Sequence, residues 1–206
     1  AGPSREPLDP LRYLSNRSSG KMGYALARAA LRRGAAVTLV SGPTALEPPE
    51  GVRLVQVTTA AEMRDAVLTA YEECTAVVMA AAVADYRIAG SSKRKIKRTS
   101  DPIEIRLEPN PDILKELGGR KDGKVLIGFA AETDDLIANA KKKLQEKNLD
   151  MIVANDVTLE GSGFEVDANA ATIIDRYDQV ESLPLMSKDE LSDRIYDHFL
   201  ALKRRA

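Results

Sequence analysis

The chain has 206 residues, of which 44% are hydrophobic and 30% are charged, and its formal net charge is −1. These proportions are typical of a globular protein, and the neutral balance excludes attraction to nucleic acid or an anionic membrane by overall charge. A single histidine, His198, and a single cysteine, Cys74, exclude a zinc–thiolate site and disfavour a histidine-based triad or metal site.

The first predicted helix begins at Met22, from which apolar residues recur at helical spacing, and it ends before Gly34. Three small residues, Ser18, Ser19 and Gly20, precede this helix. Because backbone amides at a helix N-terminus carry a partial positive charge, this loop predicts a site for phosphate or carboxylate. The alternative is a plain polar loop in which a serine caps the helix.

Short apolar runs rich in β-branched residues predict buried parallel strands over residues 37–40, 76–79, 125–127 and 151–154. Helical patterns alternate with these strands. The second predicted helix starts with a capping box of Thr59 and Glu62, and the last starts with a capping box of Ser187 and Glu190. The third has Asn110 as N-cap, Pro111 at its first position and Asp112 in its first turn. The fourth covers residues 134–147. This alternation predicts an α/β fold with a Rossmann-like, doubly wound, mostly parallel sheet.

Two segments interrupt the alternation. Residues 87–107 are polar and basic, and the alternating pattern of residues 95–97 and 103–107 predicts a β-arm that projects from the domain. Residues 171–185 predict a terminal hairpin whose turn includes Asp178.

The organisation of the chain is expected to be simple. We expect one domain over residues 1–206. Residues 1–4 resemble a loop that follows a strand, which predicts either that a first strand was trimmed or that the chain is a piece of a longer polypeptide. No apolar run approaches the ~18–20 residues of a membrane span, and no signal peptide is visible. With a single cysteine, these features favour a cytoplasmic protein that makes no membrane contact.

Residues suited to contact a nucleotide follow two of the predicted strands. Ala80, Ala81 and Asp85 come after one strand, and Phe129 comes after another. Ligands of such sheets bind at the carboxyl ends of the strands, where alanines let a flat base or sugar reach the backbone. Asp85 can hold a hydroxyl, an amide or a metal. The alternatives are tight helix packing with a capping aspartate and a phenylalanine of the core.

Lysines supply charge that suits phosphate. Lys95 and Lys97 share one face of the predicted arm strand, an arrangement suited to a triphosphate, and Lys143 and Lys147 share one helical face. The alternative in both cases is a solvated surface. Nucleic-acid binding by the basic arm is disfavoured, because the chain has only 3 Phe and no Trp for stacking on bases.

Taken together and in order, these motifs resemble phosphopantothenoylcysteine synthetase, the CTP-dependent ligase half of the bifunctional coenzyme A biosynthesis protein of bacteria. The first matching motif, residues 9–23, reads DPLRYLSNRSSGKMG. The others are residues 81–86, 95–97, 110–113, 128–133 and 148–156. The resemblance covers nearly the whole chain.

The resemblance implies a ligase that joins 4′-phosphopantothenate to L-cysteine with CTP, through an acyl-cytidylate, and with Mg²⁺ as cofactor. It also implies a homodimer in which residues 87–107 form the dimerisation segment, so that Lys95 can serve the partner's site. A flavin-dependent decarboxylase domain, fused or associated, is a further expected partner, although its sequence is not part of this chain. No covalent nucleophile of the enzyme is required.

Site residues follow from the same resemblance. Asn16 is implied in conversion of the acyl-cytidylate and Lys95 in holding the triphosphate, and we expect Asn16, Ser18, Ser19 and Gly20 to bind phosphopantothenate. The positions that match CTP contacts are Ala80, Ala81, Asp85, Lys95, Asn110, Pro111, Asp112, Ile113, Phe129, Lys143 and Lys147.

Two other functions remain as alternatives. An NAD(P)-binding oxidoreductase is disfavoured, because the loop before the first helix lacks the G-x-G-x-x-G pattern and no acid follows Val40 to accept a ribose hydroxyl. A module without enzymatic activity, which senses a nucleotide or dimerises through the basic arm, is the other.

Overall fold

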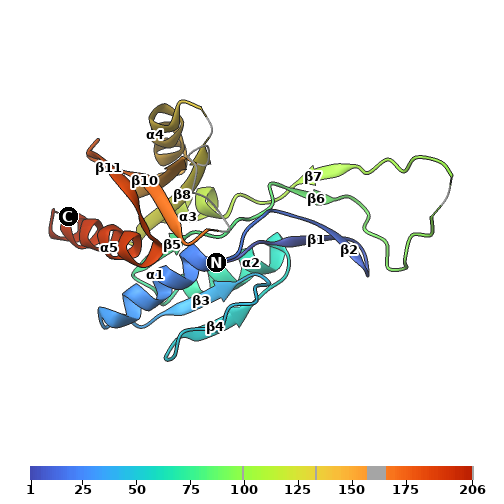
Figure 1. Cartoon of the computed structure of the whole chain (residues 1–206), viewed down its shortest axis with the longest axis horizontal. Helices are drawn as coiled ribbons and strands as arrows, with labels where there is room; N and C mark the ends of the chain where they lie inside the picture. Colours follow the sequence, from blue (N-terminus) through green and yellow to red (C-terminus); the bar gives the residue numbers. More distant parts are fainter. Residues whose placement is uncertain (99, 133, 157–165, 206) are drawn as a thin grey trace.

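A computed structural model of the chain describes residues 1–98, 100–132, 134–156 and 166–205 (Figure 1). Its main sheet has five strands in the order β11-β10-β9-β8-β5. Their bounds are β5 Ala76–Met79, β8 Val125–Glu132, β9 Met151–Asp156, β10 Ala168–Asp175 and β11 Val180–Ser187. β5, β8 and β9 are parallel, whereas β10 and β11 form the predicted hairpin and run antiparallel. The α/β fold expected from the sequence is confirmed.

Helices cover both faces of this sheet. Successive strand residues point to opposite faces, so Ile127 packs with α1 and α5 while Leu126 packs with α2, α3 and α4. The burial of both faces explains the continuous apolar runs of these strands. The helices are α1 Lys21–Arg32, α2 Ala60–Tyr71, α3 Ile113–Gly119, α4 Leu136–Glu146 and α5 Lys188–Arg205. None of the described helices is both long and apolar enough to cross a membrane.

The predicted strand at residues 37–40 forms as β3, Thr38–Ser41, but it pairs with a strand that the sequence reading missed, β4 Arg53–Gln56. Residues 1–4 lie between this pair and the main sheet. The Ala1 amine donates to Val40 O at 2.6 Å, and the Ala82 amide donates to Gly2 O at 2.9 Å. These residues therefore bridge the two sheets rather than forming only a loop.

Most of the predicted helix ends are found. The Thr59–Glu62 and Ser187–Glu190 pairs both make the expected reciprocal hydrogen bonds, and Gly34 follows α1 with a φ of 79°. The start of α3 was predicted two residues too early. Asp112, not Asn110, is its N-cap, and the Asp112 side chain accepts a hydrogen bond from the Lys115 amide at 3.1 Å.

Residues 87–98 and 100–107 project from the rest of the molecule as an arm, and these described residues form strands only at its base (Figure 1). There β6 Tyr86–Ile88 pairs with β7 Leu107–Pro109, beside the hairpin of β1 Arg5–Asp9 and β2 Arg12–Ser15. The strands predicted at residues 95–97 and 103–106 were wrong. Ile103 and Ile105 are 52% and 47% exposed, so no packed face stabilises a strand there.

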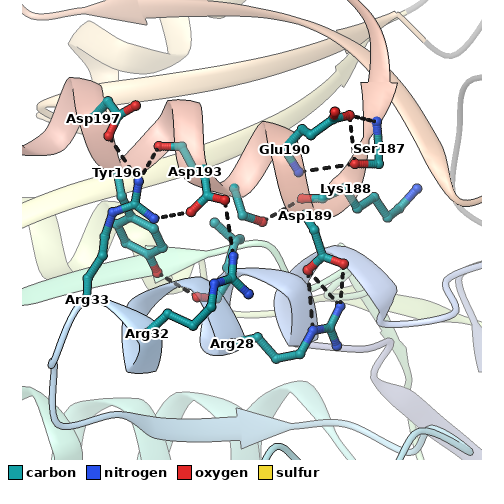
Figure 2. A network of polar contacts seen from close by, with 12 residues as sticks. Arg28, Arg32, Arg33, Ser187, Lys188, Asp189, Glu190, Asp193, Tyr196 and Asp197 are labelled. Atoms are coloured by element: carbon teal, nitrogen blue, oxygen red, sulfur yellow. Dashed lines mark hydrogen bonds and ion pairs between the residues drawn. The ribbon is translucent and has the colours of Figure 1, made fainter.

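Ion pairs connect α5 to α1 (Figure 2). Three arginines on the solvent-facing side of α1 and at its C-cap form ion pairs with three aspartates of α5. The pairs are Arg28–Asp189, Arg32–Asp193, Arg33–Asp193 and Arg33–Asp197. The Tyr196 hydroxyl also donates to the Leu26 carbonyl of α1 at 3.1 Å. Together with buried residues of both helices, this network holds the C-terminal half of α1 against residues 189–197 of α5.

Candidate functional site

A cavity of about 590 Å³ lies at the carboxyl ends of β5, β8 and β9, the edge where ligands of such sheets bind. Its walls come from separate parts of the chain: the loop before α1, the segment after β5, the start of α3, β8, α4, and the first residues of β10 and α5. The predicted site residues that line it are Asn16, Ser18, Gly20, Ala80, Ala81, Asp85, Asn110, Pro111, Asp112, Ile113, Phe129, Lys143 and Lys147.

Asn16 ties the loop before α1 to the wall that follows β5. Its side-chain amide donates to the Ala82 carbonyl at 3.2 Å and to the Val83 carbonyl at 3.1 Å. The loop then turns at Gly20, whose φ of 79° favours glycine, and α1 begins at the next residue. The Gly20 and Lys21 amides donate to Ser18 Oγ and Ser19 Oγ, each at 3.4 Å, and Asn16, Ser18, Gly20 and Lys21 all line the cavity.

Two buried side-chain amide oxygens in the cavity wall accept no hydrogen bond in the described part of the structure. Asn110 is fixed by its Nδ2, which donates to the Ala84 carbonyl at 2.9 Å, yet its Oδ1 is buried and has no hydrogen-bond partner in the described structure. The same is true of Asn155 Oδ1, at the end of β9. A buried carbonyl oxygen without a donor costs about 1–3 kcal/mol. Both oxygens are therefore positioned to accept a hydrogen bond from a bound ligand.

Charged groups from two helices meet on the side of the cavity formed by α3 and α4. Lys147, the C-cap residue of α4, forms an ion pair with Asp112, the N-cap of α3, at 2.9 Å, so the ends of the two helices are held together. Lys143 lies one turn earlier on the same helix and also lines the cavity. Phe129 of β8 is half-buried and packs against the core between α1, α5 and the sheet.

A second pair of lysines lies on the side of the cavity formed by α1 and α5. Lys21 forms an ion pair with Asp167 at 2.7 Å. The Lys188 ammonium donates to Asn169 Oδ1 at 2.8 Å and to the Val166 carbonyl at 2.5 Å. Burial, followed by repulsion from Lys21, lowers the pKa of Lys188 to about 8, although Asp167 acts in the opposite direction.

Two predicted site residues lie elsewhere in the described structure. Lys95 belongs to the arm and does not line the cavity of its own chain, and Ser19 lies in the loop but not in the lining. The polar and charged lining residues that were not predicted as site residues are Arg17, Lys21, Asn155, Asn169 and Lys188. Asn155 could have been predicted from the sequence, because it lies near the end of a buried strand at the same edge of the sheet. Lys188 could not, because it lies inside a capping box, where a solvent-exposed lysine is the ordinary expectation.

Among the described residues, no three His, Cys, Asp or Glu side chains form a group that could hold a metal ion. Two carboxylates, those of Asp85 and Asp112, nevertheless line the cavity, and Asp112 is already paired with Lys147. Mg²⁺ is commonly held by one or two carboxylates together with substrate phosphates, so this donor set fits Mg²⁺ that arrives with a nucleotide.

Comparison with known proteins agrees with this architecture. The family described as the DNA/pantothenate metabolism flavoprotein C-terminal domain matches residues 1–202. The chain belongs to this family. A crystal structure of the C-terminal domain of the coenzyme A biosynthesis bifunctional protein CoaBC is 44% identical, with a TM-score of 0.86 over 100% of this chain and 94% of that one.

The curated relatives are longer than the part of them that matches this chain. The coenzyme A biosynthesis bifunctional protein CoaBC of Bacillus subtilis is 46% identical over 206 residues, which are 100% of this chain and 51% of that protein. A cysteine/cysteine sulfinic acid decarboxylase of an unknown prokaryotic organism is 47% identical over 98% of this chain and 57% of its own length. The chain therefore spans about half the length of the curated relatives that it matches.

Proposed function

We propose that this chain is a ligase of coenzyme A biosynthesis that joins 4′-phosphopantothenate to L-cysteine with CTP. The phosphopantothenate carboxylate attacks the α-phosphorus of CTP, which forms an acyl-cytidylate and releases pyrophosphate. The cysteine amine then attacks the acyl carbon, which forms the amide and releases CMP and a proton. Neither step needs a covalent nucleophile from the protein.

One observation carries this proposal. A single cavity at the carboxyl edge of the sheet gathers the loop before α1, the segment after β5, the start of α3 and the lysines of α4. The resemblance assigns each of these segments to the same reaction, although long stretches of sequence separate them. The full-length similarity to the C-terminal half of a bifunctional coenzyme A biosynthesis protein supports the same activity.

Within this proposal, residues on different sides of the cavity bind different substrates. Asn16 and the loop from Ser18 to Gly20 would hold the phosphopantothenate side, where the amides of α1 favour negative charge. Asp85, Asn110 and the lysines of α4 would hold CTP; Ala80 and Ala81 let the nucleotide approach the backbone. Positive charge and aligned donors promote this reaction because negative charge shifts onto the leaving pyrophosphate.

Mg²⁺ fits this division of roles as a companion of CTP. Asp85 is the carboxylate that we expect to hold it, since Asp112 is engaged by Lys147. When bound, the ion would neutralise charge on the phosphates. A homodimer in which Lys95 serves the partner's cavity, a flavin-dependent decarboxylase as fused or associated partner, and a cytoplasmic location remain predictions.

The proposal is tested by measuring pyrophosphate after the protein is mixed with CTP, Mg²⁺, 4′-phosphopantothenate and cysteine. We expect pyrophosphate and CMP to form in equal amounts, with neither product when 4′-phosphopantothenate is omitted. Replacing CTP by ATP measures how strictly the base is selected. A folded protein that releases no pyrophosphate with any of these nucleotides would contradict the proposal.

A further inference from the structure

The turn between β1 and β2 holds a buried carboxylate, that of Asp9, which is only 3% exposed. Its Oδ1 accepts hydrogen bonds from the Leu11 and Arg12 amides at 2.9 and 3.0 Å, and its Oδ2 accepts one from Arg12 Nε at 3.1 Å. Hydrogen bonding to Arg12 holds the pKa of Asp9 well below its usual range, so this carboxyl group is ionised at neutral pH. These bonds close the turn.

The same two side chains also hold the arm, because the β1–β2 hairpin lies beside its base (Figure 1). The Ile96 amide donates to Asp9 Oδ2 at 3.1 Å, and Arg12 Nη2 donates to the Ile96 carbonyl at 2.9 Å. One ion pair thus binds both backbone hydrogen-bonding groups of Ile96, as a neighbouring strand would. The Ser92 amide adds a bond to the Leu8 carbonyl at 2.9 Å. The turn itself does not need any of these bonds.

Ile96 stands between the two arm lysines that suit a triphosphate. Lys95 and Lys97 are both exposed, whereas Ile96 is half-buried. The Ile96 amide belongs to the planar peptide group that follows Lys95, and the Ile96 carbonyl belongs to the one that precedes Lys97. Binding both groups therefore fixes the direction in which the Lys95 side chain leaves the arm. A lysine on a fixed backbone loses less conformational freedom when it binds phosphate.

We propose that Asp9 is a positioning residue that, through the main chain of Ile96, holds Lys95 in place for the triphosphate of CTP. This inference rests on the proposed ligase function, in which Lys95 serves the cavity of its own chain or of the partner. Asp9 is not among the residues that line the described cavity, so it acts through the arm. The simpler role, closing the β1–β2 turn, does not involve Lys95.

Asp9→Asn separates the two roles. Asparagine keeps one oxygen that can accept the amides of the turn, but its side-chain nitrogen cannot accept from Ile96 or Arg12. We expect hydrogen exchange of the Ile96 amide, measured by NMR, to become about tenfold faster. Asp175→Asn is the matched control, because Asp175 is also buried in a hairpin turn, accepts two amides of that turn and does not line the cavity. It should leave the exchange of Ile96 unchanged.

The dissociation constant for CTP with Mg²⁺ then tests whether Asp9 acts through Lys95. Calorimetric titration measures it in wild type, Asp9→Asn, Lys95→Ala and the double variant. We expect Asp9→Asn to weaken binding about tenfold in the wild-type background. In the Lys95→Ala background the same substitution should change the constant by less than about twofold, because the lysine that Asp9 positions is gone. A residue that only closed the turn would act equally in both backgrounds.

Equal effects of Asp9→Asn in both backgrounds would overturn the inference, and so would an unchanged dissociation constant in the folded variant. If Asp9→Asn does not fold, the wild type decides: an Ile96 amide that exchanges as fast as in an unstructured peptide overturns the inference, and a protected amide supports it. A wild type that binds CTP but releases no pyrophosphate contradicts only the ligase proposal, and the titrations still test Asp9. A wild type that does not bind CTP contradicts both.

Discussion

Asn16 joins the anion-binding loop to the opposite wall through two donated hydrogen bonds, to the carbonyls of Ala82 and Val83. Aspartate has nearly the same shape, but an ionised carboxylate cannot donate to either carbonyl. In Asn16→Asp we expect amide formation to fall by about tenfold or more while acyl-cytidylate accumulates, because the resemblance implies Asn16 in conversion of the acyl-cytidylate and not in its formation. Rapid quench with radiolabelled CTP measures both species.

The matched control for this substitution is Asn139→Asp. Asn139 also donates its side-chain amide to a backbone carbonyl, that of Asp134 at 2.9 Å, but it lies on α4 and does not line the cavity. Its replacement should leave both half-reactions unchanged. If Asn16→Asp slowed both half-reactions equally, the role assigned to Asn16 would be wrong.

Because Asn155 Oδ1 accepts no hydrogen bond in the described structure, we expect its removal to weaken substrate binding more than it lowers the free energy of unfolding. Asn155→Ala removes a buried acceptor that has no donor, so we expect the free energy of unfolding to stay within about 1 kcal/mol of wild type. The ligand then loses a hydrogen bond, and KM for one substrate should rise by about 2- to 10-fold. Chemical denaturation and steady-state kinetics measure the two effects.

Asn169→Ala is the contrasting variant, since Asn169 Oδ1 already accepts a hydrogen bond from the buried Lys188 ammonium. Its loss should lower the free energy of unfolding by about 1–3 kcal/mol. Equal stability losses in Asn155→Ala and Asn169→Ala, with no change of KM in the former, would contradict this account.

At the scale of residues, prediction from the sequence depended on whether a side chain had a distinctive neighbourhood along the chain. Asn16, Asp85 and Phe129 each stand next to small residues at the end of a loop or strand, and all three line the cavity. Lys188 stands beside acidic residues in a helix start, where solvation is the ordinary expectation. Its burial is produced by the packing of α5 against the sheet, which no local pattern reveals.

At the scale of elements, the network between α1 and α5 predicts a specific response to acid. Hydrogen bonding to Arg33 lowers the pKa of Asp193, so its ion pairs stabilise the fold above the ordinary carboxyl value of 3.8 and are lost as the pH falls through the lowered pKa. At pH 7, Asp193→Asn should lower the free energy of unfolding by about 0.5–1 kcal/mol, as is usual for partly exposed pairs. Urea denaturation at several pH values measures this difference.

The difference between wild type and Asp193→Asn should vanish below that lowered pKa and shrink in high salt, which screens exposed charges. Asp65→Asn provides the control, because Asp65 pairs only with its sequence neighbour Arg64 among the ion pairs described. A stability difference for Asp193→Asn that does not depend on pH would show that the ion pairs are not its cause.

Elements with a strong local signal were predicted well. The capping boxes of α2 and α5 and the apolar runs of β5, β8 and β9 form as expected, because both faces of this sheet are covered. β4 was missed because its burial is only partial and its sequence mixes charged and apolar residues. The arm failed for the opposite reason: its alternation of residues is clear, but Ile103 and Ile105 are exposed, and the main chain of Ile96 bonds to the side chains of Asp9 and Arg12 instead of to a partner strand.

At the scale of the whole molecule, the resemblance predicts a homodimer in which Lys95 of one chain acts in the partner's cavity. Mixing Asn16→Asp with Lys95→Ala tests this directly. After subunit exchange, half of the dimers are mixed and each carries one intact cavity, so activity should recover to about one quarter of wild type. Sedimentation equilibrium measures the assembly, and steady-state turnover measures the recovery.

Each variant alone, taken through the same exchange procedure, is the control and should keep its own low activity, below the one quarter expected of the mixture. If Lys95 served the cavity of its own chain, every cavity of a mixed dimer would still lack one group, and activity would not recover. The exposed Ile103 and Ile105 of the arm supply apolar surface that such an association would cover.

The alanines after β5 have a consequence for inhibition. Ala80, Ala81 and Ala82 line the cavity with methyl groups and main chain, and the Ala82 backbone also bonds to Gly2 and Ser4. An inhibitor seated on this stretch would contact atoms that every amino acid shares. Larger side chains here would fill the space that CTP would occupy under the proposed function. Resistance by substitution would therefore carry a loss of activity, which makes this stretch a durable target.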